Sequence, residues 1–283
     1  MKPKIDSTVP LAFSLGMQPV SNRFLSFEDS APPFFDLSFN WDESLGCMVL
    51  TKKFPVKEIR PQFEWITCFE PEEHLDQMVG HIIEICGVSS QTKIVGYSFK
   101  DDSTLERIGR NTSAVTWRLD PSRDLGIADQ LASVESFQEA FTEEKAEKIA
   151  LENGKSDIVI ARHVVEHAYD IQTFINGLEN LIQDNGFVVF ELPNCERAMA
   201  HGDCTILWEE HTAYFTRNSF RELIDKKGLD IIFEDEYEYP LENSIFMIVK
   251  KNKAERSLHQ TNRTDKDLYH SFTRKVEVRR TVI

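Results

Sequence analysis

Residues 93–119 read KIVGYSFKDDSTLERIGRNTSAVTWRL, and this stretch decides the fold. An apolar run, Lys93 to Ser98, is followed by an amphipathic segment, Ser103 to Arg110, and by a second apolar run, Ala114 to Leu119. Apolar runs that alternate with helical segments are typical of a mostly parallel sheet with helices on both faces. The stretch therefore predicts the first strand-helix-strand unit of an α/β domain.

The same alternation continues toward the C-terminus. Two more apolar runs and two amphipathic segments follow, and the chain then has a last pair of apolar runs that only nine residues separate. Nine residues are too few for a helical crossover, so this pair predicts an antiparallel hairpin. The runs are Asp157 to Ala161 and Gly186 to Leu192, the amphipathic segments are Phe137 to Asn153 and Ile171 to Gln183, and the final pair is Leu229 to Glu234 and Ser244 to Val249.

The residues before this alternation predict a second, smaller unit. Residues 1–60 are rich in Pro, Phe and Ser, with short apolar runs between turn signals, which is typical of a loop-rich β structure. Apolar residues then recur at helical spacing from Glu70 to Cys86, with a glycine directly after the end. We expect a β-rich module over residues 1–68 and a main domain over residues 69–250.

Residues 251–283 form the one basic segment, with nine Lys and Arg against four Asp and Glu. Leu268, Phe272, Val276 and Arg279 fall on one face of a helix, which predicts a terminal helix. Its short apolar stripe indicates a solvated helix or a contact with a partner, in preference to nucleic-acid binding.

The composition narrows the function further. With 47 Asp and Glu against 32 Lys and Arg, the net charge of -15 would repel a phosphate backbone, so we do not expect a nucleic-acid substrate. The five cysteines form no C-x-x-C pair, which indicates reduced thiols and neither a zinc cluster nor a disulfide framework. Because the sequence has no signal-peptide core and no apolar run of about 18 residues, we expect a cytoplasmic protein without a membrane span.

The first strand-to-helix loop, Gly96 to Leu105, is where sheets of this kind hold a cofactor. It has no G-x-G-x-x-G, which argues against the competing hypothesis of an NAD enzyme. Its acidic residues, Asp101 and Asp102, suit a cationic sulfonium better than a phosphate, although both could instead cap the helix that follows. At the end of the second run, Asp120 precedes Pro121; its carboxylate could accept hydrogen bonds from an adenosine ribose or initiate a turn.

Residues 162–167 read RHVVEH and match the H-x-x-E-H pattern of some zinc peptidases. That chemistry needs both histidines on one long helix and a later third ligand, whereas His163 stands at the exit of an apolar run. We therefore expect no metal here. At the carboxyl end of a strand, His163 and His167 would instead line a ligand crevice, and packing is the alternative role of His167.

Residues 207–216 read LWEEHTAYFT and form the strongest group of candidate residues. A histidine beside carboxylates, as His211 is beside Glu210, can act as a general base near neutral pH because the carboxylate stabilises the imidazolium. The alternatives are a surface Glu-His pair, and a Thr216 that only caps the next helix.

Three segments together resemble one known family. Leu15 to Asn22 looks like an L-G-x-x-P-x-x-N opening, Asp157 to Asp170 resembles an apolar strand followed by V-x-x-H, and Trp208 to Phe215 corresponds to Y-x-E-H-x-x-Y-F. These segments are similar to the S-adenosylmethionine (SAM) dependent sugar C-methyltransferases, whose members carry an N-terminal zinc module and a C-terminal half that this chain lacks. The resemblance implies a class I, Rossmann-like methyltransferase sheet with an antiparallel terminal strand.

The resemblance also implies a cofactor, an acceptor and site residues. The cofactor is SAM, the acceptor a small molecule such as a nucleotide-linked keto-sugar, and His211 the base that removes a proton next to the ketone, with Glu210 orienting it. Cofactor-binding residues by position are Gly96, Ser98, Lys100, Asp101, Asp120, Pro121, Phe137, Ala161, Arg162 and His163. Substrate-binding residues by position are Trp65, Trp208, Tyr214 and His167.

The chain departs from the family at several positions. The cysteine pairs of the zinc module are missing, so no structural zinc is expected, and the glycine-rich E-x-G-x-x-x-G loop is replaced around Gly96. Family tyrosines appear as Phe63, Trp65 and Trp208. These departures leave open a second hypothesis, a catalytically inactive methyltransferase-like subunit that acts through a protein partner or a homo-oligomer.

Overall fold

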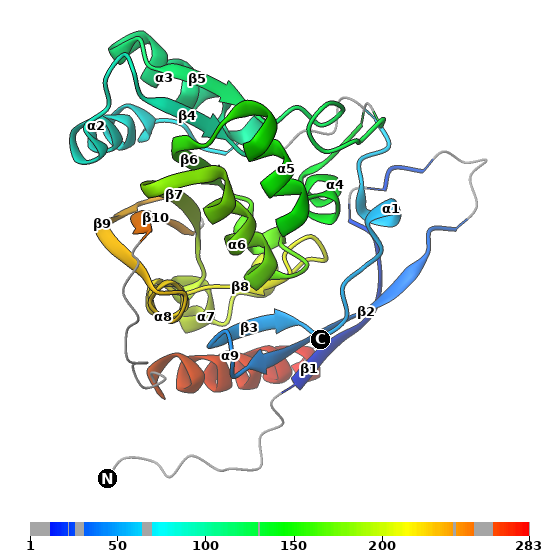
Figure 1. The fold of residues 1–283 in the computed structure, drawn as a ribbon. Helices are drawn as coiled ribbons and strands as arrows, with labels where there is room; N and C mark the ends of the chain where they lie inside the picture. The colour runs from blue at the N-terminus through cyan, green and yellow to red at the C-terminus, as the bar shows by residue number, and fades with distance from the viewer. Residues whose placement is uncertain are drawn as a thin grey trace.

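The computed structural model describes residues 12–21, 23–25, 31–63, 70–129, 131–239, 242–251 and 263–282. A six-stranded sheet has the order β5-β4-β6-β7-β10-β9 (Figure 1). Its strands are β4 (Lys93–Gly96), β5 (Val115–Arg118), β6 (Ser156–Arg162), β7 (Ile182–Asn194), β9 (Leu229–Tyr237) and β10 (Asn243–Lys251). The first four strands are parallel, while β10 runs antiparallel to both β7 and β9. The predicted α/β sheet and terminal hairpin are confirmed.

Helices cover both faces of this sheet because the strand residues alternate between two cores. Along β6, Ile158 and Ile160 pack against one layer of helices, whereas Val159 and Ala161 pack against the other. The first layer consists of α2 (Leu75–Cys86) and α3 (Asp102–Thr112). The second consists of α4 (Val134–Ala140), α5 (Glu143–Asn153), α6 (Ile171–Leu181) and α8 (Arg217–Lys226).

The prediction of one helical segment from Phe137 to Asn153 is wrong, because these residues belong to two helices, α4 and α5. Phe141 has extended backbone angles, φ -88° and ψ 96°, and ends α4. Thr142 then begins α5, and its side chain accepts a hydrogen bond from the backbone N–H of Lys145. An N-capping threonine inside an apolar pattern is the local signal for this break.

A second, antiparallel sheet has the order β1-β2-β3-β8. Its strands are β1 (Ala12–Pro19), β2 (Phe34–Asp42), β3 (Cys47–Leu50) and β8 (Ala213–Tyr214). Three strands come from the predicted N-terminal β unit, and the short fourth strand belongs to the LWEEHTAYFT segment. The N-terminal residues therefore contact the segment that contains His211. The described residues also form α1 (Val56–Ile59), α7 (Glu196–His201) and three 3-10 turns, Phe99–Asp101, Val165–His167 and Cys204–Ile206.

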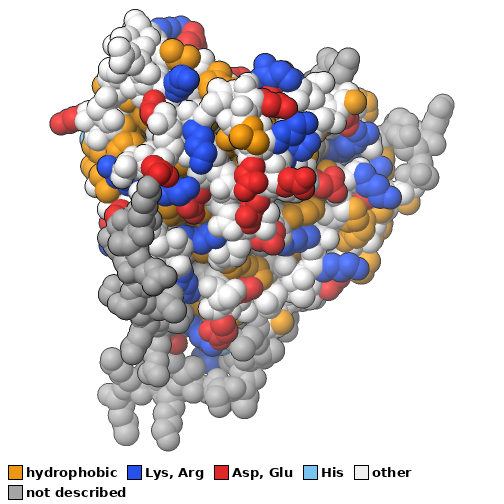
Figure 2. Space-filling model, in the orientation of Figure 1, with side chains coloured by type: hydrophobic (Ala, Val, Ile, Leu, Met, Phe, Trp, Pro, Cys, Tyr) orange, Lys and Arg blue, Asp and Glu red, His pale blue; other side chains and the backbone are white. Residues whose placement is uncertain are grey.

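The C-terminal helix α9 (Arg263–Val282) lies along this second sheet (Figure 1). Tyr269, Phe272 and Val276 are buried in one core with Phe13 and Phe39. The expectation of a solvated helix is therefore wrong for its apolar stripe, which covers the N-terminal strands of the same chain. Acidic and basic side chains are interspersed on the molecular face that Figure 2 shows. Among the described residues, no helix is long and apolar enough to cross a bilayer.

Candidate active site

The residues singled out from the sequence converge on one edge of the six-stranded sheet. They follow the carboxyl ends of three parallel strands: Ser98 and Asp101 follow β4, Asp120 follows β5, and His163 follows β6. Ligands of open α/β sheets bind at this edge, because the loops there present backbone and side-chain polar groups. The topology therefore brings together sequence segments that lie up to about 65 residues apart in the chain.

Hydrogen bonds to the Asp101 side chain fix the conformation of the loop after β4. The Asp101 carboxylate accepts hydrogen bonds from the backbone N–H groups of Ser98, at 2.9 Å, and of Arg162, at 3.0 Å. Burial outweighs these contacts and raises the pKa of Asp101 to about 7. Ser98 caps the short 3-10 turn Phe99–Asp101, with Asp101 as the reciprocal member of its capping box, whereas at the start of the helix that follows Asp101 makes no side-chain capping hydrogen bond.

Close packing explains why residue 96 is a glycine, without reference to a cofactor. A Cβ atom at this position would lie 2.8 Å from the Leu105 side chain and 2.9 Å from that of Asp101. Glycine is therefore required for the close approach of β4 to the helix that follows it. The aromatic ring after it, Tyr97, is fully buried and packs edge-on against Phe137, with a centroid separation of 6.0 Å.

Asp120 acts as a turn residue, one of the two roles predicted for it, through one of its carboxylate oxygens. Oδ1 accepts a hydrogen bond from the backbone N–H of Arg123 at 2.7 Å, and the Asp120 N–H donates to the Asp124 carboxylate at 2.7 Å. The residue is half-buried, as is Pro121. The turn thus fixes the orientation of a carboxylate at the end of β5.

Arg162 forms a buried ion pair that the sequence analysis missed. Its Nε lies 2.5 Å from Oε2 of Glu191, and its Nη1 donates to the Lys100 carbonyl at 2.8 Å. Oε1 of Glu191 accepts hydrogen bonds from Tyr239 and Ser244, at 2.7 and 2.9 Å. A charged residue inside the apolar run Gly186 to Leu192 was the available signal for Glu191. The position of Arg162 corrects the expectation of an open cofactor-facing side chain, since it is 1% exposed.

Three other predicted cofactor contacts also have partners within the protein. His163 has a positive φ of 48°, and its Nε2 lies 3.3 Å from Glu191. Burial alone would lower the pKa of His163, but Glu70 and Glu191 raise it to about 10, so the ring is a cation at neutral pH. Nζ of Lys100 donates to Glu70 at 2.7 Å, and Ala161 is buried in the core.

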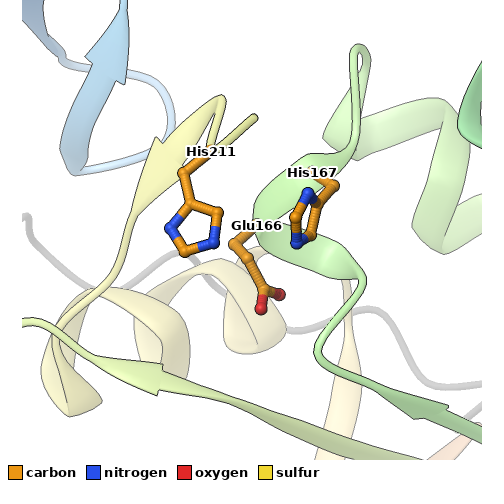
Figure 3. Close-up of side chains that lie close together, drawn as sticks. All are labelled: Glu166, His167 and His211. Atoms are coloured by element: carbon orange, nitrogen blue, oxygen red, sulfur yellow. The ribbon is translucent and has the colours of Figure 1, made fainter. Parts of the chain in front are cut away.

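A cluster of Glu166, His167 and His211 lies next to this ion-pair network. Glu166 and His167 belong to the 3-10 turn Val165–His167 after β6, and His211 precedes β8. One ligand atom of each residue lies within 4.8 Å of those of the other two. Figure 3 shows the two imidazole rings pointing toward one another, with the Glu166 carboxylate beside the gap. The rings are 4.8 Å apart in a T-shaped arrangement.

The two histidines of the cluster have opposite pKa shifts. Burial, and after it the neighbouring His167, lower the pKa of His211 to about 3. Burial opposes charge on His167 as well, but a 2.8 Å contact between its Nδ1 and Glu135 raises its pKa. The expectation that neighbouring carboxylates hold the pKa of His211 near neutrality is therefore wrong, because desolvation dominates.

Glu166 places a carboxylate beside His211, while Glu210 remains the residue predicted to orient that ring. Glu210 is half-buried on the loop before β8. Its neighbour Glu209 accepts hydrogen bonds from the backbone N–H and the hydroxyl of Ser21, at 2.5 and 2.8 Å, and so joins the loop to the N-terminal segment. This link between two motifs of the sequence was not expected.

Tyr214 has a structural role, which corrects its assignment to substrate binding. Its hydroxyl donates to the Trp208 carbonyl at 3.0 Å and accepts from the Trp208 N–H at 3.2 Å. The side chain is 1% exposed and packs edge-on against Phe39. Trp208 is half-buried, with its ring 5.2 Å from that of His211. Trp65, the remaining predicted substrate contact, lies outside the described residues.

The residues at this edge fit the chemical groups of SAM. Nη2 of Arg162 and the Tyr97 hydroxyl are buried polar atoms that have no hydrogen-bond partner among the described residues. A guanidinium N–H suits the carboxylate of an amino acid, and the carboxylates of Asp101 and Asp120 suit a sulfonium and a ribose. Of these residues, the half-buried Asp120 is the one that would hold the ribose, because Arg162 and Asp101 are fully buried and already bonded within the protein.

Comparisons with known proteins find sequence similarity to methyltransferases. Residues 110–233 match a family model described as a methyltransferase domain. Over 161 residues the chain is 26% identical to the C-methyltransferase NovU of Streptomyces niveus; this alignment covers 56% of the chain and 38% of that relative. The chain thus spans well under half the length of the curated relative it matches.

The solved structures to which the chain is similar include two methyltransferases. Magnesium protoporphyrin IX methyltransferase (ChlM) from Synechocystis PCC 6803 with bound SAH is 13% identical, with a TM-score of 0.43, and 64% of this chain and 83% of that chain are covered. The 1,6-didemethyltoxoflavin-N1-methyltransferase of Burkholderia thailandensis is 8% identical, with a TM-score of 0.44, covering 64% and 80%. By its strand order the chain has a Rossmann-like α/β sheet with an antiparallel terminal hairpin, and its residues 110–233 resemble a methyltransferase domain.

Proposed function

We propose that this protein is a SAM-dependent methyltransferase that transfers a methyl group to carbon of a small acceptor, with His211 as the proton acceptor. The observation that carries the proposal is the buried cluster of His211, His167 and Glu166 at the sheet edge where Asp101 and Asp120 also lie. The family-model match over residues 110–233 and the similarity to a C-methyltransferase support methyl transfer to carbon.

His211 is suited to accept a proton in this setting. Burial and the neighbouring His167 hold its pKa at about 3, so the ring is neutral at neutral pH and carries a lone pair. The adjacent Glu166 carboxylate stabilises the imidazolium once a proton arrives. The low pKa makes His211 a weak base in the ligand-free protein, so removal of a C–H proton beside a carbonyl also requires that the site stabilise the developing enolate.

When bound, SAM supplies an electrophilic methyl group. The remaining requirement is positioning, since a carbon nucleophile must meet that methyl group in line. Loop segments from both sheets would hold the acceptor, because the LWEEHTAYFT loop is fixed by β8, by Tyr214 and by the Ser21–Glu209 contact. We propose a carbonyl-bearing sugar, linked to a nucleotide, as the acceptor class.

Calorimetric titration of the full chain with SAM and with S-adenosylhomocysteine tests the proposal. We expect one molecule of either nucleoside per chain. Transfer of a labelled methyl group from SAM to nucleotide-linked keto-sugars then tests the acceptor class. A chain that binds neither nucleoside is not a methyltransferase, and a chain that binds SAM but methylates only non-sugar acceptors refutes the sugar.

A further inference from the structure

We propose that Glu166, His167 and His211 form a binding site for one divalent transition-metal ion, of which Zn²⁺ fits the donor set best. The site is not the zinc module of the related family, whose cysteines this chain lacks. It also differs from the H-x-x-E-H zinc pattern, because it uses only one of the two histidines of that pattern and takes the other from a loop 44 residues further along the chain.

The three side chains present suitable donor atoms close to one another. Two imidazole nitrogens and one carboxylate oxygen lie within 4.8 Å of one another. An ion that binds each donor at about 2.0–2.2 Å needs the donors about 3–3.5 Å apart, which small side-chain rotations achieve. Two histidines and one carboxylate are a ligand set that Zn²⁺ and Fe²⁺ accept, with further positions open to water or to an acceptor oxygen.

One oxygen of the Glu166 carboxylate, Oε2, is buried without a hydrogen-bond partner among the described residues. Its side chain is 4% exposed, so water contributes little to its solvation. A carboxylate oxygen that is left buried without a partner is costly, whereas a cation shared with the two imidazoles would satisfy it.

The contacts behind the donors complete the pattern. A Glu135 oxygen lies 2.8 Å from Nδ1 of His167, which leaves Nε2 of the same ring for a ligand. Such a carboxylate-histidine pair orients a metal-binding imidazole. The turn that holds Glu166 is fixed by the Thr212 backbone N–H, which donates to the Glu166 carbonyl at 2.7 Å. Thr212 follows His211 directly, so one backbone contact keeps both halves of the site together.

The inference goes beyond the proposed function, although the two share the cluster. A bound ion would take the lone pair with which His211 accepts a proton, so the proposed metal site is inhibitory and the chain would transfer methyl groups only in its metal-free state. Metal binding and SAM binding use different residues and are measured separately. The failure of either proposal therefore leaves the other standing.

The test is a titration of the full chain with Co²⁺, followed by displacement with Zn²⁺. Chelator-treated protein is titrated with Co²⁺ and the visible absorption of the bound ion is recorded; Zn²⁺ is then added, and SAM binding is measured on the same samples. We expect one equivalent of Co²⁺ in the unaltered chain, displaced by one equivalent of Zn²⁺. Affinity should fall at least tenfold in His211→Ala and in Glu166→Gln, and should not change in His201→Ala, whose ring lies on α7 outside the cluster.

Two results would overturn the inference: no stoichiometric binding by the unaltered chain, or an unchanged affinity in Glu166→Gln. Glu166→Gln is nearly isosteric, so it remains decisive if His211→Ala fails to fold. If the unaltered chain binds SAM normally but binds no Co²⁺, the metal site is refuted and the proposed methyltransferase function is not.

Discussion

Nδ1 of His167 lies 2.8 Å from a carboxylate oxygen of Glu135, and this contact joins helix α4 to the turn after β6. Both side chains are almost fully buried. The contact contributes to the opposite pKa shifts of the two clustered histidines, because it raises the pKa of His167 while burial and the neighbouring His167 lower that of His211. The arrangement yields predictions on titration, turnover and stability.

Glu135→Gln should lower the pKa of His167 in metal-free protein. The substitution removes the hydrogen-bonding charge that opposes burial, so the neutral ring becomes favoured. Nuclear magnetic resonance titration of the ring nitrogens measures the change. Glu139→Gln, an exposed position on the same helix, is the matched control. An unchanged His167 titration in Glu135→Gln would show that the carboxylate has no influence on the ring.

His211→Ala should reduce methyl transfer by about 10²–10⁴-fold, the range for loss of a general acid or base. SAM affinity should stay nearly constant, because His211 lies outside the loops after β4 and β5. Single-turnover rates and calorimetry on the same protein separate the two effects. Equal turnover of the variant and the unaltered protein would remove His211 from the reaction.

Asp120→Ala should weaken SAM binding by about 1.5–3 kcal/mol, as expected for a lost hydrogen bond to a charged group. Asp120→Asn keeps an oxygen that can accept from the Arg123 N–H and so preserves the turn. We expect weaker binding in both variants, measured by calorimetry. If only the alanine variant loses affinity, the residue acts through the turn and not on the ribose.

Asp101→Asn should change how stability depends on pH. The pKa of Asp101 is raised from 3.8 to about 7 in the folded protein, so its stabilising contribution is complete below pH 3.8 and is lost as pH rises toward 7. The loss is at most about 1.4 kcal/mol per pH unit for one proton. Urea unfolding at several pH values should show this fall in the unaltered protein, relative to the variant. Parallel curves for the two proteins would contradict the buried acid.

Phe272→Ala should destabilise the protein by about 3–5 kcal/mol, the usual cost of truncating a buried aromatic side chain. Phe272 is fully buried between α9 and the N-terminal sheet, with its ring 5.9 Å from that of Phe13. Thermal unfolding measures the loss, and Arg274→Ala on the exposed side of α9 serves as the control. Equal effects of the two substitutions would place α9 outside the core.

The amino-acid sequence by itself determined the main sheet. Alternating apolar runs and amphipathic segments report local periodicity and burial on both faces, so the strands from β4 to β7, the hairpin of β9 and β10, and the helices α2, α3 and α6 were predictable. Residues at strand ends, such as Asp120 and His163, were placed at the carboxyl edge for the same reason. Parallel strands end at a common edge, whatever their order in the sheet.

Tertiary structure alone decided which side chains meet at that edge. Glu135 reaches His167 across 32 residues, and Glu191 reaches Arg162 across 29, from a helix and a strand that pack beside the same turn. Local periodicity carries no information on such long-range pairs. Burial likewise set the direction of the His211 pKa shift, because desolvation outweighs neighbouring carboxylates only once the folded chain excludes water. The position of α9 against the N-terminal strands follows from the same long-range packing.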